Sequence, residues 1–220
     1  MAFGDWTQYV NQGWVFAINV TTPLVGIGSG RFTPAPFGAG TDMSNIVVTN
    51  LSGRTKGVTQ GKIRSLFRYT NPPTAGTLNG FGFTFMMSAE NVSTSTGNFY
   101  GAGYDFNTGR LHIRKATLSS LSSIGSGTGL AQSEIVTPGN GVVMSLEVEW
   151  IADTVELGGT AIFVRTGSLN DFSDLTTVIS YLDTATPYTT TVAESIYIIT
   201  GNGIGAAWSL DFDQTTLFIP

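Results

Sequence analysis

Two acidic residues, Glu147 and Glu149, have the spacing of a pair that could hydrolyse glycosidic bonds. They lie two residues apart in the run VMSLEVEWI, so on a strand both side chains share one face. Two carboxyl groups on one face can act as acid and base, or as acid and nucleophile, toward a sugar chain. The alternate positions are apolar: Met144, Leu146, Val148 and Trp150. We favour the simpler interpretation that Glu147 and Glu149 lie on the solvated face of an antiparallel sheet, with Trp150 buried between two sheets.

The single histidine, His112, is the second residue with catalytic chemistry. It stands in the run RLHIRKATL, where strand alternation places it beside Arg110 and Arg114 and opposite Leu111 and Ile113. Catalysis by histidine needs an orienting acid and a nucleophile, and no nucleophile signature such as Gly-x-Ser-x-Gly is present. We therefore expect His112 on a solvated face, without a catalytic role.

One segment, residues 105–109, begins as a calcium-binding loop does. Its sequence DFNTG lacks the later acid of an EF-hand, and the same residues are typical of a tight hairpin turn. The Gly-rich runs at 26–30 and 125–129 lack the Lys-Ser/Thr and the helix that a phosphate-binding loop requires. The sequence therefore predicts no catalytic residue, no metal site and no cofactor, and a protein that is not an enzyme.

The composition restricts the remaining classes of function. Charged residues make up 11% of the 220 residues, and there is no cysteine, which excludes disulfides and cysteine-based zinc sites. The first ten residues carry an acid and no basic stretch, so we expect no secretory leader. No apolar run approaches 18 residues, so we expect no membrane insertion.

Charge is distributed unevenly along the chain. Residues 1–115 carry nine Lys and Arg against four Asp and Glu, a net of +5, whereas residues 116–220 carry one against eleven, a net of −10. We favour basic and acidic strands that neighbour each other within one fold. The alternative is two faces of opposite sign that dock copies head to tail. The basic residues between 54 and 68 are too few for nucleic-acid binding in an acidic chain.

Short runs with a period of two predict antiparallel strands, each with one buried face. The clearest lie at 62–69, 110–118 and 143–151. Further strand-like runs lie at 14–20, 45–50, 80–88, 98–106, 160–167, 177–183, 195–201 and 215–219. Turn residues separate them, and no long amphipathic helix is present, so the pattern predicts an all-β fold, an antiparallel β-sandwich. Residues 119–133 are small and polar and predict a loop between strands.

We divide the chain into an N-terminal extended segment, partly strand, at 1–44 and a β-sandwich domain at 45–220. The extended segment is rich in Gly and Pro and carries few charges. Its aromatic residues must pack on something, either this chain's own sandwich, with the first strand beside the C-terminal LFIP, or a neighbouring copy. We predict an interface at these residues: Trp6, Tyr9, Trp14, Phe32 and Phe37.

The order of the strands resembles the concanavalin A-like lectin/glucanase sandwich of the laminin-G type. The run GKIRSLFRY is followed by GFGFTFMMS and NFYGAGYDFNTGRLHIRKATL, and the closing WSLDFDQTTLFIP resembles a final strand that returns beside the N-terminus. The resemblance implies a jelly roll of two antiparallel sheets. Glucanases of this fold carry E-x-D-x-x-E on one strand, and residues 147–152 lack the third acid. The R-T-E-L-like and Q-I-H-like segments of alginate lyases are also absent.

The missing leader, the missing cysteine, the low charge and the abundance of Gly and Thr resemble a bacteriophage virion protein. This resemblance implies a structural role in the virion, as a capsid decoration, head-fibre or tail-associated protein that self-associates into a homo-oligomer and docks on other virion proteins. The alternative is a lectin-like module that binds host-surface glycans. The third hypothesis is a polysaccharide hydrolase or lyase.

Overall fold

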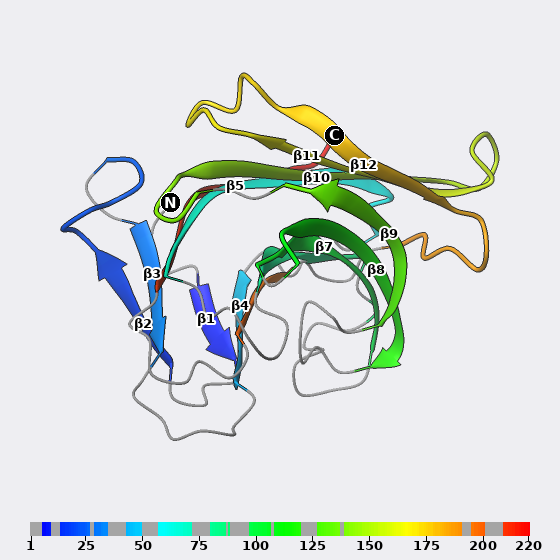
Figure 1. Cartoon of the computed structure of the whole chain (residues 1–220). Helices are drawn as coiled ribbons and strands as arrows, with labels where there is room; N and C mark the ends of the chain where they lie inside the picture. Colours follow the sequence, from blue (N-terminus) through cyan, green and yellow to red (C-terminus); the bar gives the residue numbers. More distant parts are fainter. Residues whose placement is uncertain are drawn as a thin grey trace.

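Two antiparallel sheets of seven strands each make up the computed structural model (Figure 1). The structure describes residues 6–9, 14–26, 29–34, 43–49, 57–71, 80–86, 88, 97–106, 108–119, 127–136, 139–190, 195–200 and 209–220. No helix occurs in these ranges, so none there is long and apolar enough to cross a membrane. The predicted all-β sandwich is therefore confirmed.

The first sheet has the strand order β1-β4-β13-β6-β7-β8-β9. Its strands are β1 (Trp6–Tyr9), β4 (Met43–Thr49), β13 (Ser195–Thr200), β6 (Gly80–Phe85), β7 (Gly97–Asp105), β8 (Arg110–Ser119) and β9 (Thr128–Ile135). Strands β7, β8 and β9 bend into an arch, so the face of this sheet that is turned away from the second sheet is concave (Figure 1).

The second sheet has the order β12-β11-β10-β5-β14-β3-β2 and lies across the first. Its strands are β12 (Thr176–Asp183), β11 (Gly159–Gly167), β10 (Met144–Asp153), β5 (Gln60–Thr70), β14 (Ser209–Phe218), β3 (Ser29–Pro34) and β2 (Trp14–Asn19). Neighbours in each sheet come from distant parts of the chain, as in a jelly roll: β5 pairs with β10 on one side and with β14 on the other.

The core lies between the two sheets and is dominated by aromatic rings. Its members include Phe67, Phe81, Phe83, Phe85, Tyr100, Tyr104, Leu146, Val148 and Trp150. The apolar register of β10 is therefore confirmed, because Trp150 has no exposed surface. Its ring lies so close to β5 that a Cβ built on Gly61 would be 2.6 Å from Trp150 Cζ2, so only glycine fits there without a shift.

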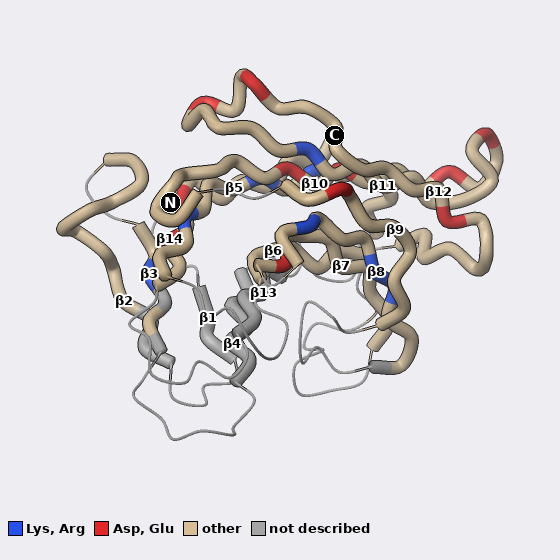
Figure 2. The backbone as a smooth tube through the Cα atoms, viewed as in Figure 1, with Lys and Arg blue, Asp and Glu red and all other residues tan. Residues whose placement is uncertain are grey.

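Basic and acidic strands alternate in the second sheet, as we favoured from the charge distribution (Figure 2). Arg68 of β5 lies 2.6 Å from Asp211 of β14, and Lys62 of β5 lies 3.8 Å from Glu147 of β10. Arg31 of β3 also binds Asp211, at 2.6 Å. Much of the charge asymmetry along the sequence is thus neutralised by cross-strand pairing inside one chain.

Two sequence-based expectations, for β9 and for β10, are wrong. The predicted loop at 119–133 ends early, because residues from Thr128 onward form β9, an edge strand whose backbone pairs with β8. Its side chains are mostly exposed, which is why no apolar alternation marks it. Glu147 lies on the outer sheet face as expected, but it is buried rather than solvated, since Arg165 and Lys62 contact its carboxylate.

The described parts of residues 1–44 hold three whole strands, β1, β2 and β3, and β4 begins within the range at Met43. Strand β1 pairs with β4, and β3 pairs with the first half of β14 at Leu210–Phe212, so it is β3 rather than the first strand that lies beside the C-terminal strand. The domain boundary at residue 44 stays a prediction. The predicted interface also stays one: the side chains of Trp6, Tyr9, Trp14 and Phe32 and the whole of Phe37 lie outside the described residues.

Candidate functional site

The β7–β8 hairpin brings the chemically active side chains of the first sheet together. Its turn follows Asp105, and the Gly109 N–H donates to the Asp105 carbonyl oxygen at 2.9 Å. Gly109 has φ of 66°, a conformation that glycine adopts without strain. The turn interpretation of the 105–109 segment therefore agrees with the structure.

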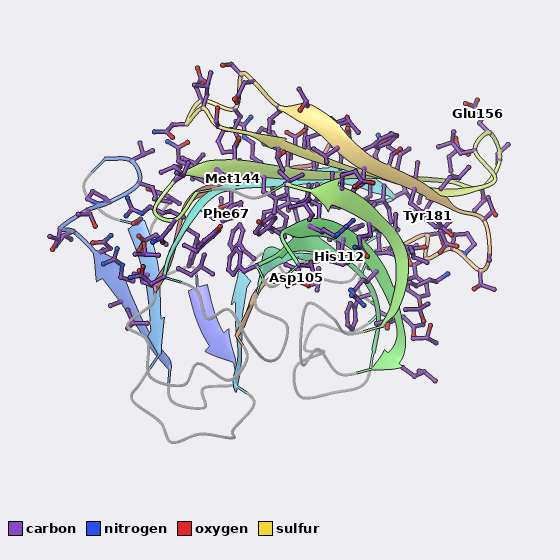
Figure 3. All side chains as sticks on the ribbon, in the orientation of Figure 1. Phe67, Asp105, His112, Met144, Glu156 and Tyr181 are labelled. Atoms are coloured by element: carbon purple, nitrogen blue, oxygen red, sulfur yellow. The ribbon has the colours of Figure 1, made fainter. Side chains whose placement is uncertain are left out.

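His112 lies on the concave face of the first sheet. Leu111 and Ile113 belong to the core, so the alternation of β8 turns His112 away from it. The imidazole Nε2 is 3.3 Å from Thr108 Oγ1 and 3.7 Å from Asp105 Oδ2, and the Thr108 hydroxyl donates to that carboxylate at 3.0 Å. Figure 3 shows Asp105 and His112 close together at this hairpin.

Burial controls the protonation of this histidine. His112 is only 6% exposed, which corrects the expectation of a solvated position. Burial lowers the pKa of His112 below its ordinary value of 6.5, and the positive charge of Arg114 lowers it further, while Asp105 opposes the shift. The imidazole is therefore neutral at neutral pH and able to accept a proton or a hydrogen bond.

On the β7 and β6 side, the strand residues level with His112 are glycines. His112 pairs with Gly103 of β7, and Gly103 pairs with Gly82 of β6. A Cβ built on Gly82 would be 2.5 Å from the Ala102 carbonyl oxygen, so the two strands approach each other closely here. On the other side His112 pairs with Gln132 of β9, which is exposed.

Two arginines flank the histidine. Arg110 and Arg114 alternate with core residues and therefore share the face of His112, and both are partly exposed. Arg110 Nη1 donates to the Ser133 carbonyl oxygen at 2.7 Å, a contact that leaves its charge in place. The cluster thus has a buried side at Asp105 and His112 and an accessible margin at the two arginines.

A second polar cluster lies behind His112, on the core side of β8, and its role is structural. Lys115 Nζ lies 2.5 Å from Asp183 Oδ2 and donates to the carbonyl oxygens of Ala185 and Thr186 at 2.8 Å. Tyr100 donates to the same carboxylate at 2.5 Å. Because these contacts saturate the ammonium group, the cluster fastens residues 183–186 to the first sheet.

The acid pair of the sequence analysis does not join His112. Glu147 and Glu149 lie on the outer face of the second sheet, where Arg165 bridges them at 2.9 Å and 2.6 Å. Carboxylates held by one guanidinium are poorly suited to donate a proton. No group of three or more potential metal ligands occurs in the described part of the chain.

Sequence reasoning named His112 with its two arginines but missed Thr108 and Asp105 as its partners. The sequence could have identified both partners, because the turn predicted near residues 105–109 brings β8 back beside β7. Opposite residues across such a turn share a face, so Asp105 and His112 are diagonal neighbours.

No protein-family model matches this chain, and no curated protein matches it in sequence. Solved structures do match its fold. The carbohydrate-binding module CBM66 from Bacillus subtilis is 12% identical and has a TM-score of 0.59, over 97% of this chain and 94% of that one. An endo-β-1,4-glucuronan lyase from the fungus Trichoderma reesei is 11% identical and has a TM-score of 0.62, over 99% and 92%. A legume lectin-like domain from Entamoeba histolytica is 9% identical with a TM-score of 0.62, over 99% and 91%.

These similarities establish the fold. The chain is a jelly-roll β-sandwich of the kind found in lectin-like, carbohydrate-binding and polysaccharide lyase proteins. The predicted concanavalin A-like architecture is therefore confirmed. The resemblance to bacteriophage virion proteins has no counterpart among these three structures.

Proposed function

We propose that this protein is a glycan-binding module whose site is the concave face around His112. The observation that carries the proposal is the cluster of Asp105, Thr108 and His112 beside two partly exposed arginines on that face. Hydroxyl-rich ligands are recognised by convergent donors and acceptors of this kind. The shared fold with a carbohydrate-binding module and a lectin-like domain supports the same class of ligand.

A glycan array probed with the full chain tests the proposal, followed by titration calorimetry with each oligosaccharide that binds. We expect Arg114→Ala to weaken binding at least tenfold. Lys62→Ala, on the outer face of the second sheet, is the matched control and should bind as the wild type does. An array without any bound glycan, or an Arg114→Ala variant with full affinity, contradicts the proposal.

A polysaccharide lyase is the second candidate function. A neutral imidazole beside cations could remove the C5 proton of a uronate while a guanidinium stabilises the carboxylate; the C4–O bond then breaks, a C4=C5 double bond forms, and the departing O4 takes a proton from water while the imidazolium returns its proton to solvent. The fold shared with the glucuronan lyase favours this candidate over a hydrolase. The ultraviolet absorbance of the unsaturated product distinguishes the two functions. We expect no unsaturated product. Product that forms with the wild type and not with His112→Asn would make the protein a lyase.

The virion role, the virion localisation and self-association through residues 1–44 stay predictions without support from the similar structures. Light scattering of the purified chain tests self-association directly, and binding of host-surface glycans on the array is compatible with either location.

A further inference from the structure

An asparagine–glycine pair, Asn140-Gly141, lies on the surface shortly before β10 begins. An asparagine amide loses ammonia when the backbone nitrogen of the next residue attacks its Cγ atom, and asparagine is for this reason a thermolabile residue. Glycine in the next position leaves that nitrogen accessible, because it has no Cβ. The chain holds two more such pairs, at 79–80 and 202–203, but only Asn140-Gly141 lies wholly within the described residues.

Packing does not shield this pair. Both residues are exposed, and Gly141 has φ of 77°, in the left-handed region. A Cβ built on Gly141 would meet nothing within 4 Å apart from its chain neighbours. Any protection of the Asn140 amide must therefore come from hydrogen bonds.

Three hydrogen bonds hold the pair against the end of β5. The Asn71 backbone N–H donates to Asn140 Oδ1 at 2.7 Å, and Asn140 Nδ2 donates to Asn71 Oδ1 at 2.8 Å. The Gly141 N–H donates to the Tyr69 carbonyl oxygen at 2.9 Å. These partners meet because β5 and β10 are antiparallel neighbours. We call the two bonds between Asn71 and Asn140 the Asn71 clamp.

The clamp opposes the geometry that the attack needs. The Asn140 amide must turn its Cγ atom toward the Gly141 nitrogen, which breaks its bonds to Asn71. The Gly141 nitrogen must lose its proton, which it donates to Tyr69 in the folded chain. One lost hydrogen bond of ordinary strength changes an equilibrium about fivefold, so the clamp should slow the reaction measurably.

We propose that Asn140 is a deamidation site, and that the Asn71 clamp holds it in the amide form until this connection opens locally. In the open state the Gly141 nitrogen gives its proton to solvent and attacks Asn140 Cγ. The Cγ–Nδ2 bond breaks, and the leaving nitrogen takes a proton from solvent and departs as ammonia. Water then opens the cyclic imide to aspartate or isoaspartate, so the reaction consumes one water and releases one ammonia. This modification is independent of glycan binding.

The product cannot restore the clamp. An ionised aspartate at position 140 has only acceptor oxygens, so its contact with Asn71 Oδ1 becomes repulsive. An isoaspartate adds its Cβ carbon to the main chain and shifts Gly141 relative to Tyr69. Deamidation should therefore release the connection between β9 and β10 from the end of β5.

Peptide mapping by mass spectrometry tests the proposal on the full chain, incubated folded and in urea at the same mildly alkaline pH. The unfolded chain gives the unprotected rate, and we expect the folded wild type to deamidate at Asn140 slower by about fivefold or more. Asn71→Gly removes the accepting oxygen and tolerates the φ of 51° at this position, so it should raise the folded-state rate about fivefold. Asn71→Asp is the matched control, because it keeps an accepting oxygen and should deamidate no faster than the wild type.

The pairs at 79–80 and 202–203 serve as internal standards in the same digests. Equal acceleration of all three pairs in Asn71→Gly would show general unfolding and overturn the clamp. Asn71→Asp that deamidates as fast as Asn71→Gly, or folded wild type that deamidates as fast as the unfolded chain, also overturns the clamp. An absence of product at Asn140 even in the unfolded chain overturns the deamidation site itself.

Discussion

The indole ring of Trp150 stacks on the phenyl ring of Phe85, with 5.1 Å between the ring centroids and 24° between the planes. Trp150 belongs to β10 and Phe85 to β6, so this contact joins the two sheets within the core. Neither side chain has any exposed surface.

Trp150→Ala should lower the free energy of unfolding by about 3–5 kcal/mol, since it removes the largest core side chain and leaves a cavity that the rigid sheets cannot close. Urea denaturation measures the loss. Val155→Ala is the control, because Val155 is 91% exposed in the β10–β11 hairpin and should change stability by less than about 0.5 kcal/mol. A Trp150→Ala variant as stable as Val155→Ala would contradict the packing described here.

Lys115→Met should destabilise the fold by about 3 kcal/mol, because it leaves the buried Asp183 carboxylate without its cation. Lys62→Met provides the comparison. Its ammonium lies 3.8 Å from Glu147 and its side chain is 35% exposed, so its removal should cost less than about 1 kcal/mol. Thermal or urea unfolding of both variants tests this order, and equal losses would show that Lys115 makes no special contribution.

His112 should make stability depend on pH. Its pKa is lower in the folded chain than the ordinary 6.5 of an unfolded chain, so the unfolded state takes up protons first as the pH falls. The stabilisation that accompanies a neutral imidazole is therefore complete above about pH 7.5 and is lost as the pH falls through about 6.5.

His112→Asn removes this dependence, since asparagine does not titrate. Urea denaturation of both proteins between about pH 7.5 and about pH 5 measures the difference. Burial raises the pKa of Asp213, which acts in the opposite direction, but this effect is common to both proteins and cancels in the comparison. Parallel stability curves would show that His112 is not held neutral by burial.

The double variant Glu147→Gln/Glu149→Gln should keep its glycan affinity within about twofold, because both residues lie on the opposite sheet from His112. Its stability should fall by about 1–3 kcal/mol, since the buried contacts between Arg165 and Glu147 lose their charge-assisted hydrogen bonds. Calorimetry and urea denaturation report the two quantities separately. A loss of glycan binding in a folded double variant would move the functional site to the outer face.

The sequence alone determined which residues share a face. Alternation between Met144 and Trp150 predicted a half-buried strand, and β10 buries its apolar register as expected. Residues 105–109 predicted a turn, and the β7–β8 hairpin turns there. These features depend on the period of two along a strand and on local turn chemistry, which are properties of neighbouring residues.

Only the tertiary structure decided what covers each face. Alternation put Glu147 opposite the core, but its burial depends on Arg165, which β11 brings beside it. Alternation also put His112 on the same face as Arg114, but it predicted neither the concave curvature of the sheet nor the burial of the imidazole. Strand order and sheet curvature arise from contacts between residues far apart in the chain, and a local period of two carries no information about them. For the same reason Lys115, on the core face of its strand, finds its partner Asp183 68 residues away.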